Sequence, residues 1–351
     1  MINKKSIVIA SHVFSYGTSQ ALRDYLLKEK WDVLFIGHNL FGNIFTWTVG
    51  VFDTFIRVVL KFRKYYLFMG SNCLNAFVGI ILRKIGFVEK VIFFTPDYSQ
   101  QRFKNRMLNN LYHWLDYYCL KEADLVWNSS SIMPIDLMVK EREKRGIPTK
   151  YRDKQIPVPD GTDEFRQLSL EQINRFEIGF VGHLKEGMGI ELLIDAMPDI
   201  KREIPEVKLV IIGSGPIEKY LREKAKDKEY IKFTGFIGDI KCVYDRLSKC
   251  AIGIAPYEPG TISQYTDPGK VKVYLTVGLP IVITKVPQVA FEIDKEKCGI
   301  AIDFDRKQLI DAVIKLLKDD EVLKQYRENT KIMSEKYRWS NIFKRALSRV
   351  V

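Results

Sequence analysis

Cysteines are few, and none of their spacings is typical of a disulfide framework or a zinc site. The chain has five in 351 residues, an odd number, and no C-x-x-C pair occurs among them. This usage favours a reducing compartment. The five are Cys73, Cys119, Cys242, Cys250 and Cys298.

Long apolar runs and a signal-peptide pattern are also lacking. Asp53 and Arg57 interrupt the apolar residues 44–60, and the run 77–82 is too short to cross a bilayer. Residues 1–5 lead into an apolar run without the cleavage site of a signal peptide. We therefore expect no export, no transmembrane helix and a cytoplasmic location.

Basic residues, in contrast, are in excess. The chain has 55 Lys and Arg against 43 Asp and Glu, a formal charge of +12, which favours an anionic partner such as a nucleotide, a membrane surface or a nucleic acid. A nucleic acid is the weaker alternative, because no zinc-finger spacing or RNA-recognition signature occurs. The length and the 46% hydrophobic content suit two domains.

Apolar runs alternate with amphipathic helical patterns in both halves of the chain. This alternation predicts an α/β protein with two Rossmann-like domains, each built on a parallel sheet. A turn-rich segment at residues 156–165 separates the halves and predicts a boundary at residue 160. The expected strands are residues 7–10, 33–37, 66–69, 91–94 and 125–128, then 178–181, 208–212, 231–234, 251–255, 281–284 and 299–302.

The segment of residues 265–283 has the pattern of an anion-binding helix start followed by a buried strand. Asp267 is expected to cap the helix, and Pro268 suits its first turn. The amides of Gly269 and Lys270 would then face an anion, to which the Lys270 ammonium adds a full positive charge. Residues 278–283 end the helix and start an apolar strand.

This segment resembles the donor-binding segment of GT-B glycosyltransferases, in particular the retaining family four and related enzymes of bacterial surface polysaccharides. Many members have D-P-x-K-x-x-E-Y-x-x-x-G-x-P-V, where this chain has D-P-G-K-V-K-V-Y-L-T-V-G-L-P-I. Val273 stands where those members have the glutamate that holds the donor sugar, which leaves the sugar and the stereochemistry open. A non-catalytic relative that binds nucleotide or glycan is the alternative.

The resemblance implies a GT-B fold with two parallel sheets facing across a cleft. It also implies a hexosyltransferase that moves a sugar from a nucleoside diphosphate to a hydroxyl of a lipid-linked or polysaccharide acceptor in cell-surface glycan synthesis. Residues 1–160 would bind the acceptor and residues 161–335 the nucleotide sugar. A C-terminal helix, residues 336–351, would cross back onto the first domain.

Several loops of the second half resemble family loops that surround the donor. Residues 180–189 resemble a G-R-L-x-x-x-K-G loop, with His183 in place of the arginine, and residues 210–216 a glycine turn beside the nucleotide. The same glycines also suit ordinary turns between a strand and a helix, and Phe236 equally suits a core. The donor residues implied are Gly182, His183, Lys185, Gly213, Gly215, Phe236, Tyr257, Glu258, Asp267, Pro268, Gly269, Lys270 and Tyr274.

Asp303 and Asp305 form a D-x-D pattern that elsewhere binds metal. Asp305 directly precedes a helical pattern at residues 306–310, so we expect it to cap that helix. We therefore expect no metal and no other cofactor. Helix amides, Lys270 and Lys185 would offset the charge of the diphosphate.

Two strand ends in the first half carry the expected acceptor site, because open α/β sheets bind ligands there. His12 and Asp97 are the candidate catalytic residues, since each can exchange a proton with a hydroxyl. A histidine satisfied by backbone and a turn aspartate remain the alternatives. The further candidates for acceptor binding are Tyr16, Gly17, Tyr98 and Arg102.

Residues 41–90 mix aromatic and aliphatic residues with lysine and arginine. That composition suits peripheral binding to the anionic inner face of a membrane. Core helices with basic solvent faces have the same composition and remain the alternative.

Overall fold

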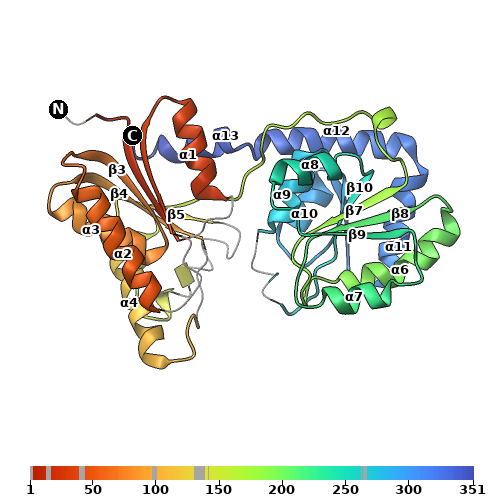
Figure 1. The fold of residues 1–351 in the computed structure, drawn as a ribbon, viewed down its shortest axis with the longest axis horizontal. Helices are drawn as coiled ribbons and strands as arrows, with labels where there is room; N and C mark the ends of the chain where they lie inside the picture. The colour runs from red at the N-terminus through yellow and green to blue at the C-terminus, as the bar shows by residue number, and fades with distance from the viewer. Residues whose placement is uncertain are drawn as a thin grey trace. The chain divides into compact units, whose positions relative to one another are not determined.

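The computed structural model describes residues 3–12, 17–38, 44–96, 101–129, 139–140, 142–261, 263 and 267–351, with residues 44–46 described by backbone only. The chain divides into two compact units (Figure 1). The first contains Met1–Asp160 and Trp339–Val351, and the second contains Gly161–Arg338. The two units are therefore described separately.

The first unit contains a six-stranded sheet with the order β2-β1-β3-β4-β5-β6, and all its strand pairs are parallel. The strands are β1 (Ser6–Ser11), β2 (Asp32–Gly37), β3 (Tyr65–Ser71), β4 (Val88–Thr95), β5 (Leu125–Asn128) and β6 (Gln155–Pro157). The helices are α1 (Thr18–Lys28), α2 (Ile44–Val59), α3 (Asn72–Lys84), α4 (Arg106–Glu122), the 3-10 helix η1 (Thr149–Tyr151) and α13 (Trp339–Leu347).

Helices cover both faces of this sheet, as its almost continuously apolar strands require. Val8 and Ala10 of β1 pack in a core with α2, α3 and α4. Ile7 and Ile9, on the opposite face, pack in a second core with α1 and α13. The C-terminal segment thus completes the hydrophobic core of the first unit.

The second unit contains a six-stranded parallel sheet with the order β12-β11-β10-β7-β8-β9. The strands are β7 (Glu177–Val181), β8 (Lys208–Ile212), β9 (Ile231–Gly235), β10 (Ile252–Ala255), β11 (Ile281–Thr284) and β12 (Gly299–Ile302). The helices are α6 (Ile190–Glu203), α7 (Glu218–Lys224), α8 (Ile240–Leu247), α9 (Gly269–Thr276), α10 (Val289–Lys295), α11 (Arg306–Lys318) and α12 (Asp320–Lys336), with the 3-10 helix η2 (Leu170–Gln172).

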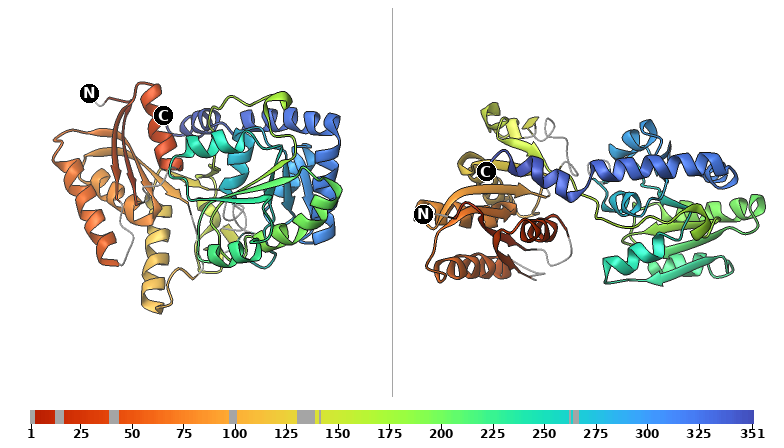
Figure 2. Two further views of the ribbon diagram at one scale, coloured as in Figure 1. Left: turned by 45° about the vertical axis from the view of Figure 1, so that its right-hand side comes forward. Right: turned by 90° about the horizontal axis from the view of Figure 1, so that it is seen from above.

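Helices also cover both faces of the second sheet. α6, α7 and α11 pack on one face, and α8, α9 and α10 pack on the other (Figures 1 and 2). α12 contacts both layers of helices. Leu323 packs in the core formed with α6, α7 and α11, and Met333 packs in the core formed with α8, α9 and α10. Asp305 accepts a hydrogen bond from the Gln308 amide and caps α11, which confirms the predicted cap.

Both sheets have a point where the strand order reverses direction, between β1 and β3 in the first and between β7 and β10 in the second. Open parallel sheets bind ligands beside such points, at the carboxyl ends of the strands. All five cysteines are free thiols. No helix in the described part of the chain has the length and apolar character needed to cross a membrane.

Candidate nucleotide-sugar site

The ammonium of Lys270 lies at the reversal point of the second sheet, between two aromatic rings. Its Nζ is 4.3 Å from the centroid of Phe180 on β7 and 4.6 Å from that of Tyr257, which follows β10. A methyl group at Gly182 would lie 3.3 Å from Nζ, so glycine leaves the space that the lysine occupies. We call the loop of residues 182–189, together with Tyr257 and Lys270, the lysine pocket.

No carboxylate forms an ion pair with Lys270 among the residues that the structure describes. Burial and, to a smaller extent, the charge of the nearby Lys185 lower the pKa of Lys270 to about 7. The aromatic faces offset only part of the lost hydration. An anion in the lysine pocket would therefore be stabilised by a cation that lacks a partner of opposite charge.

The expected cap of α9 was wrong. Pro268 is the N-cap residue and provides no side-chain hydrogen bond, while Asp267 forms an ion pair with Lys272 at 2.9 Å. Lys272 is buried, and its Nζ lies 3.8 Å from the ring centroid of Tyr337. A buried lysine needs a carboxylate more than helix amides need a cap, because an unpaired charge costs more in the interior.

The start of α9 nevertheless presents unused amide donors. In the described part of the chain, the amides of Gly269 and Lys270 donate no hydrogen bond, whereas the Val271 amide donates to the Pro268 carbonyl. Gly269 is exposed, and a Cβ there would meet no atom within 4 Å. This end of the helix thus combines free amides with the adjacent lysine pocket.

Tyr274 holds the scaffold of the site together and is fully buried. Its hydroxyl accepts a hydrogen bond from the Val181 amide at 3.1 Å and donates one to the Ile254 carbonyl at 2.9 Å. It therefore joins the ends of β7 and β10, the two strands that flank the reversal point. The sequence implied a donor contact for Tyr274, but its hydroxyl is occupied by backbone.

The glycines after β8 allow two loops to pack backbone against backbone. A Cβ at Gly213 would lie 2.0 Å from the Gly182 carbonyl oxygen, and one at Gly215 would lie 2.2 Å from that of Leu184. Side chains at these positions would separate the loops. Gly213 and Gly215 thus contact the protein's own backbone. His183 and Lys185, on the loop after β7, are exposed.

Three carboxylates, those of Glu258, Glu191 and Glu186, lie close enough to influence one another. Burial raises the pKa of Glu258, and the charges of Glu191 and Glu186 raise it further. The Glu258 amide donates to the Gly187 carbonyl at 3.1 Å, which joins the loop after β10 to the loop after β7. The sequence interpretation missed Glu186 and Glu191. The position of Glu191 in the first turn of α6 was the one signal for it. Val273 is half-buried and packs in the core.

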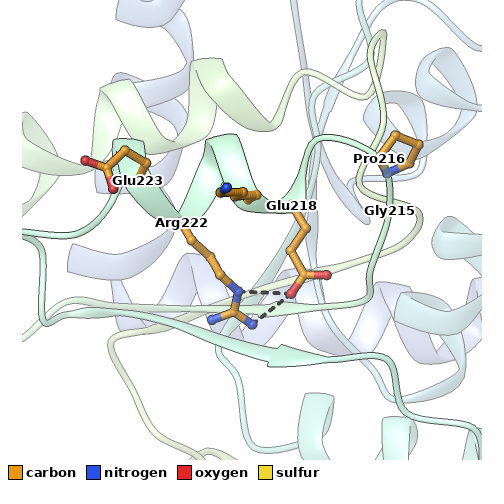
Figure 3. Close-up of a pocket in the computed structure, with 6 residues that line it drawn as sticks. Gly215, Pro216, Glu218, Arg222 and Glu223 are labelled. Carbon is orange, nitrogen blue, oxygen red and sulfur yellow. Dashed lines mark hydrogen bonds and ion pairs between the residues drawn. The ribbon is translucent and has the colours of Figure 1, made fainter.

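Phe236 follows β9 and has 77% of its surface exposed. A shallow depression in the same unit is lined by Gly215 and Pro216 and by residues of α7 (Figure 3). Its most prominent contact is internal, since Arg222 donates to Glu218 at 2.8 and 2.9 Å. The depression includes no residue of the lysine pocket, so its lining does not define the donor site.

Comparisons with known proteins agree with this architecture. Residues 175–319 match the family model described as Glycosyl transferases group 1. The chain is 22% identical over 280 residues to the uncharacterised glycosyltransferase MJ1069 of Methanocaldococcus jannaschii, covering 77% of this chain and 70% of that protein. It is 31% identical over 191 residues to MJ1607 of the same organism, also an uncharacterised glycosyltransferase, covering 52% of this chain and 47% of that protein.

The solved structure of Anabaena Alr3699/HepE in complex with UDP has the same fold. The TM-score is 0.67 at 15% identity, and the match covers 98% of each chain. The chain has the fold of the GT-B glycosyltransferases and contains a glycosyl transferases group 1 domain. The group 1 domain lies within the second unit, and the predicted resemblance to glycosyltransferases and the GT-B fold class are confirmed.

In the first unit, the structure describes only part of the expected acceptor site. Tyr16, Asp97 and Tyr98 lie outside the described residues, so their roles stay predictions. Gly17 is the N-cap residue of α1 in extended conformation, and His12 follows β1.

A small cavity of about 20 Å³ lies at the carboxyl ends of β3 and β4 in the first unit. Arg102 lines it together with Asn72, Thr95 and Asp116. The sequence interpretation missed the last three. Asp116 is buried and forms two hydrogen bonds with the buried Arg142, at 2.9 and 3.0 Å, so its charge is matched within the unit.

Proposed function

We propose that this glycosyltransferase binds a nucleoside diphosphate sugar at the lysine pocket and transfers the sugar to a hydroxyl of a lipid-linked or polysaccharide acceptor in cell-surface glycan synthesis. The observation that carries the proposal is the Lys270 ammonium, which has no carboxylate partner in the described part and lies beside free helix amides. The HepE structures, which contain UDP or UDP-glucose, support a nucleotide-sugar donor.

The proposed chemical role of the lysine pocket is to offset charge on the departing diphosphate. Such stabilisation acts where negative charge develops as the bond from sugar to phosphate breaks. Lys270 would contact the diphosphate, Lys185 would supply a second positive charge, and Phe236 would stack on the base. Glu258 and its neighbouring carboxylates would accept hydrogen bonds from sugar hydroxyls.

Calorimetric titration with UDP tests the donor site. Lys270→Ala removes a charge-assisted contact worth about 1.5 to 3 kcal/mol, so affinity should fall about tenfold to a hundredfold. Lys307→Ala is the matched control, because Lys307 is exposed on α11 and belongs to the same unit. Equal UDP affinity in wild type and Lys270→Ala would remove the donor from this pocket.

We propose further that the reaction needs no divalent metal, because lysines and helix amides supply the positive field. The described residues include no group of three or more His, Cys, Asp or Glu side chains arranged to hold a metal ion. Transfer should continue in the presence of a chelator. Loss of activity that only manganese or magnesium restores would contradict this part of the proposal.

We also propose that the first unit binds an anionic membrane surface through α2. Val49, Phe52, Ile56 and Leu60 recur at helical spacing, and 48 to 63% of each is exposed. Phe62, just past the helix, is 84% exposed. Exposed apolar residues beside lysines suit a helix lying in a membrane interface.

Sedimentation with vesicles of anionic phospholipid tests the surface of α2. Phe52→Ser with Ile56→Ser should weaken binding by removing apolar contact, and Lys61→Glu with Lys64→Glu should weaken it at low salt. Arg63 is left unchanged, because it binds Asp32 at 2.6 Å and stabilises the unit itself. Binding that survives both double substitutions would show that α2 does not contact the lipid.

A further inference from the structure

His12 lies at the reversal point of the first sheet, where two asparagine side chains face one of its ring nitrogens. Nδ1 of His12 is 2.6 Å from Nδ2 of Asn75 and 3.4 Å from Nδ2 of Asn72. Both asparagines belong to the first turn of α3, which follows the neighbouring strand β3. The arrangement thus spans the two strands that flank the reversal point.

Backbone contacts fix which atom each asparagine presents to His12. The same Nδ2 of Asn75 lies 2.8 Å from the Ser71 carbonyl oxygen, which only accepts, so this atom must be the amide nitrogen. Oδ1 of Asn72 accepts a hydrogen bond from the Asn75 amide at 3.2 Å, which turns the Asn72 nitrogen toward the ring. Both asparagines therefore donate toward Nδ1, and Nδ1 cannot carry a proton.

The surroundings also keep the ring neutral. Burial and, to a smaller extent, the charge of His38, whose ring centroid is 5.6 Å away, lower the pKa of His12 to about 4, against a small opposite effect of the Trp47 carbonyl. Asp53 and Arg57 of α2, which pair with each other, interact with His38 rather than with His12. A neutral ring whose Nδ1 accepts must carry its proton on Nε2.

We infer that His12 acts as a hydrogen-bond donor, through Nε2–H, to an oxygen atom of the sugar acceptor, and that Asn75 and Asn72 are positioning residues that fix this tautomer. Nε2 is buried and makes no hydrogen bond of good geometry among the described residues, so the Trp47 carbonyl, which slightly raises the pKa of His12, is a weak competitor for its proton. The identity of the ligand rests on the proposed function, whereas the tautomer does not. His12 is then not the general base, because its lone pair at Nδ1 is engaged by the asparagines.

Nitrogen NMR of the full chain labelled at its four histidines tests the tautomer without any substrate. His12 should show the neutral Nε2–H pattern between pH 5 and pH 8. Asn75→Asp has the same shape but accepts where asparagine donates, so the His12 proton should move to Nδ1 or the ring should become charged. A neutral Nδ1–H pattern in the wild type, or titration near the ordinary value, would overturn the inference.

Transfer rates test the donor role of His12. Glutamine keeps an N–H donor but has no basic nitrogen, so His12→Gln should stay within about tenfold of wild type, whereas His12→Ala should lose more. The shape of the pH profile should be the same in wild type and His12→Gln, and thermal melts verify folding. Equal loss in both folded variants would overturn the donor role. Failure of transfer in the wild type would instead contradict the proposed function, and the tautomer would still be measurable.

Discussion

The two sheets place opposite chemistry at equivalent points of their topology. At the reversal point of the second sheet, Lys270 has no carboxylate partner among the described residues, Lys185 is near enough to lower its pKa, and the first amides of α9 donate no hydrogen bond within that part of the chain. At the reversal point of the first sheet, His12 is neutral, and the side-chain amides of two asparagines face its Nδ1. The one buried carboxylate beside the cavity of the first sheet, Asp116, is matched by Arg142.

The proposed binding roles of the two units rest on this difference. Both sites use the carboxyl edge of a parallel sheet, so the fold alone does not distinguish them. A lysine that pairs with no carboxylate in the described part of the chain favours a diphosphate, whereas neutral donors and acceptors suit hydroxyl groups. The proposed division into donor and acceptor units thus follows from the side chains at the two reversal points.

Each unit also has a buried ion pair next to its site, and breaking the pair of the first unit should have the largest effect. Asp116→Ala leaves the buried Arg142 without its carboxylate, which should cost about 3 to 5 kcal/mol of unfolding free energy. Hydrogen exchange in the strands of the first unit, followed through denaturant, measures the loss. Asp32→Ala is the control, because its pair with Arg63 is exposed and should contribute at most about 1 kcal/mol. Equal effects of the two substitutions would mean that the Asp116 pair is not a strong constraint.

The second prediction contrasts the pH dependence of the two sites. Since the pKa of Lys270 is about 7 in the free protein, donor binding above that pH must take up a proton. Affinity for UDP-glucose should be constant below pH 7 and fall by up to about tenfold per pH unit from pH 7 to pH 9. Calorimetry at pH 8 in two buffers that differ in ionisation enthalpy measures the proton uptake directly.

Lys270→Arg provides the control for this pH dependence, because a guanidinium stays charged throughout the range. Its affinity for UDP-glucose should be lower than that of the wild type at pH 6 but independent of pH. His12, neutral over the same range, should add no pH dependence to the wild-type curve. A flat wild-type curve would show that Lys270 is already charged in the free protein.

Much of the fold was predictable from the sequence, because buried parallel strands are continuous apolar runs between helical patterns. The strand at residues 281–284 was expected and is β11, and the cap at Asp305 was recognisable from the helical pattern after it. Lys270 was recognisable because glycine, proline and lysine together favour an anion-binding helix start. These features depend on residues close together in the sequence.

The rest depends on contacts between distant residues. Asp267 was expected at the helix amides but pairs with Lys272. This pairing follows from the burial of Lys272 against the ring of Tyr337, which is distant in the sequence. Tyr274 was expected at the donor but bonds the backbone of β7 and β10. Asn75 gave no signal, since its role needs the ring of His12, 63 positions earlier in the chain.

The smallest predicted effect concerns Phe236. Its ring would be an uncharged contact to the donor, in addition to the charged contact proposed for Lys270. The ring is 77% exposed, so Phe236→Ala should leave the thermal melt unchanged. If the ring stacks on the base, the substitution should cost about 1 to 3 kcal/mol of UDP affinity, because stacking of a base on an aromatic ring is worth that much. Phe291→Ala is the matched control, since this ring of α10 is also exposed, at 52%, and lies outside the lysine pocket. Titration with UDP and with inorganic diphosphate separates the two contributions: loss for UDP alone assigns Phe236 to the base, and unchanged UDP affinity would return it to an ordinary exposed side chain.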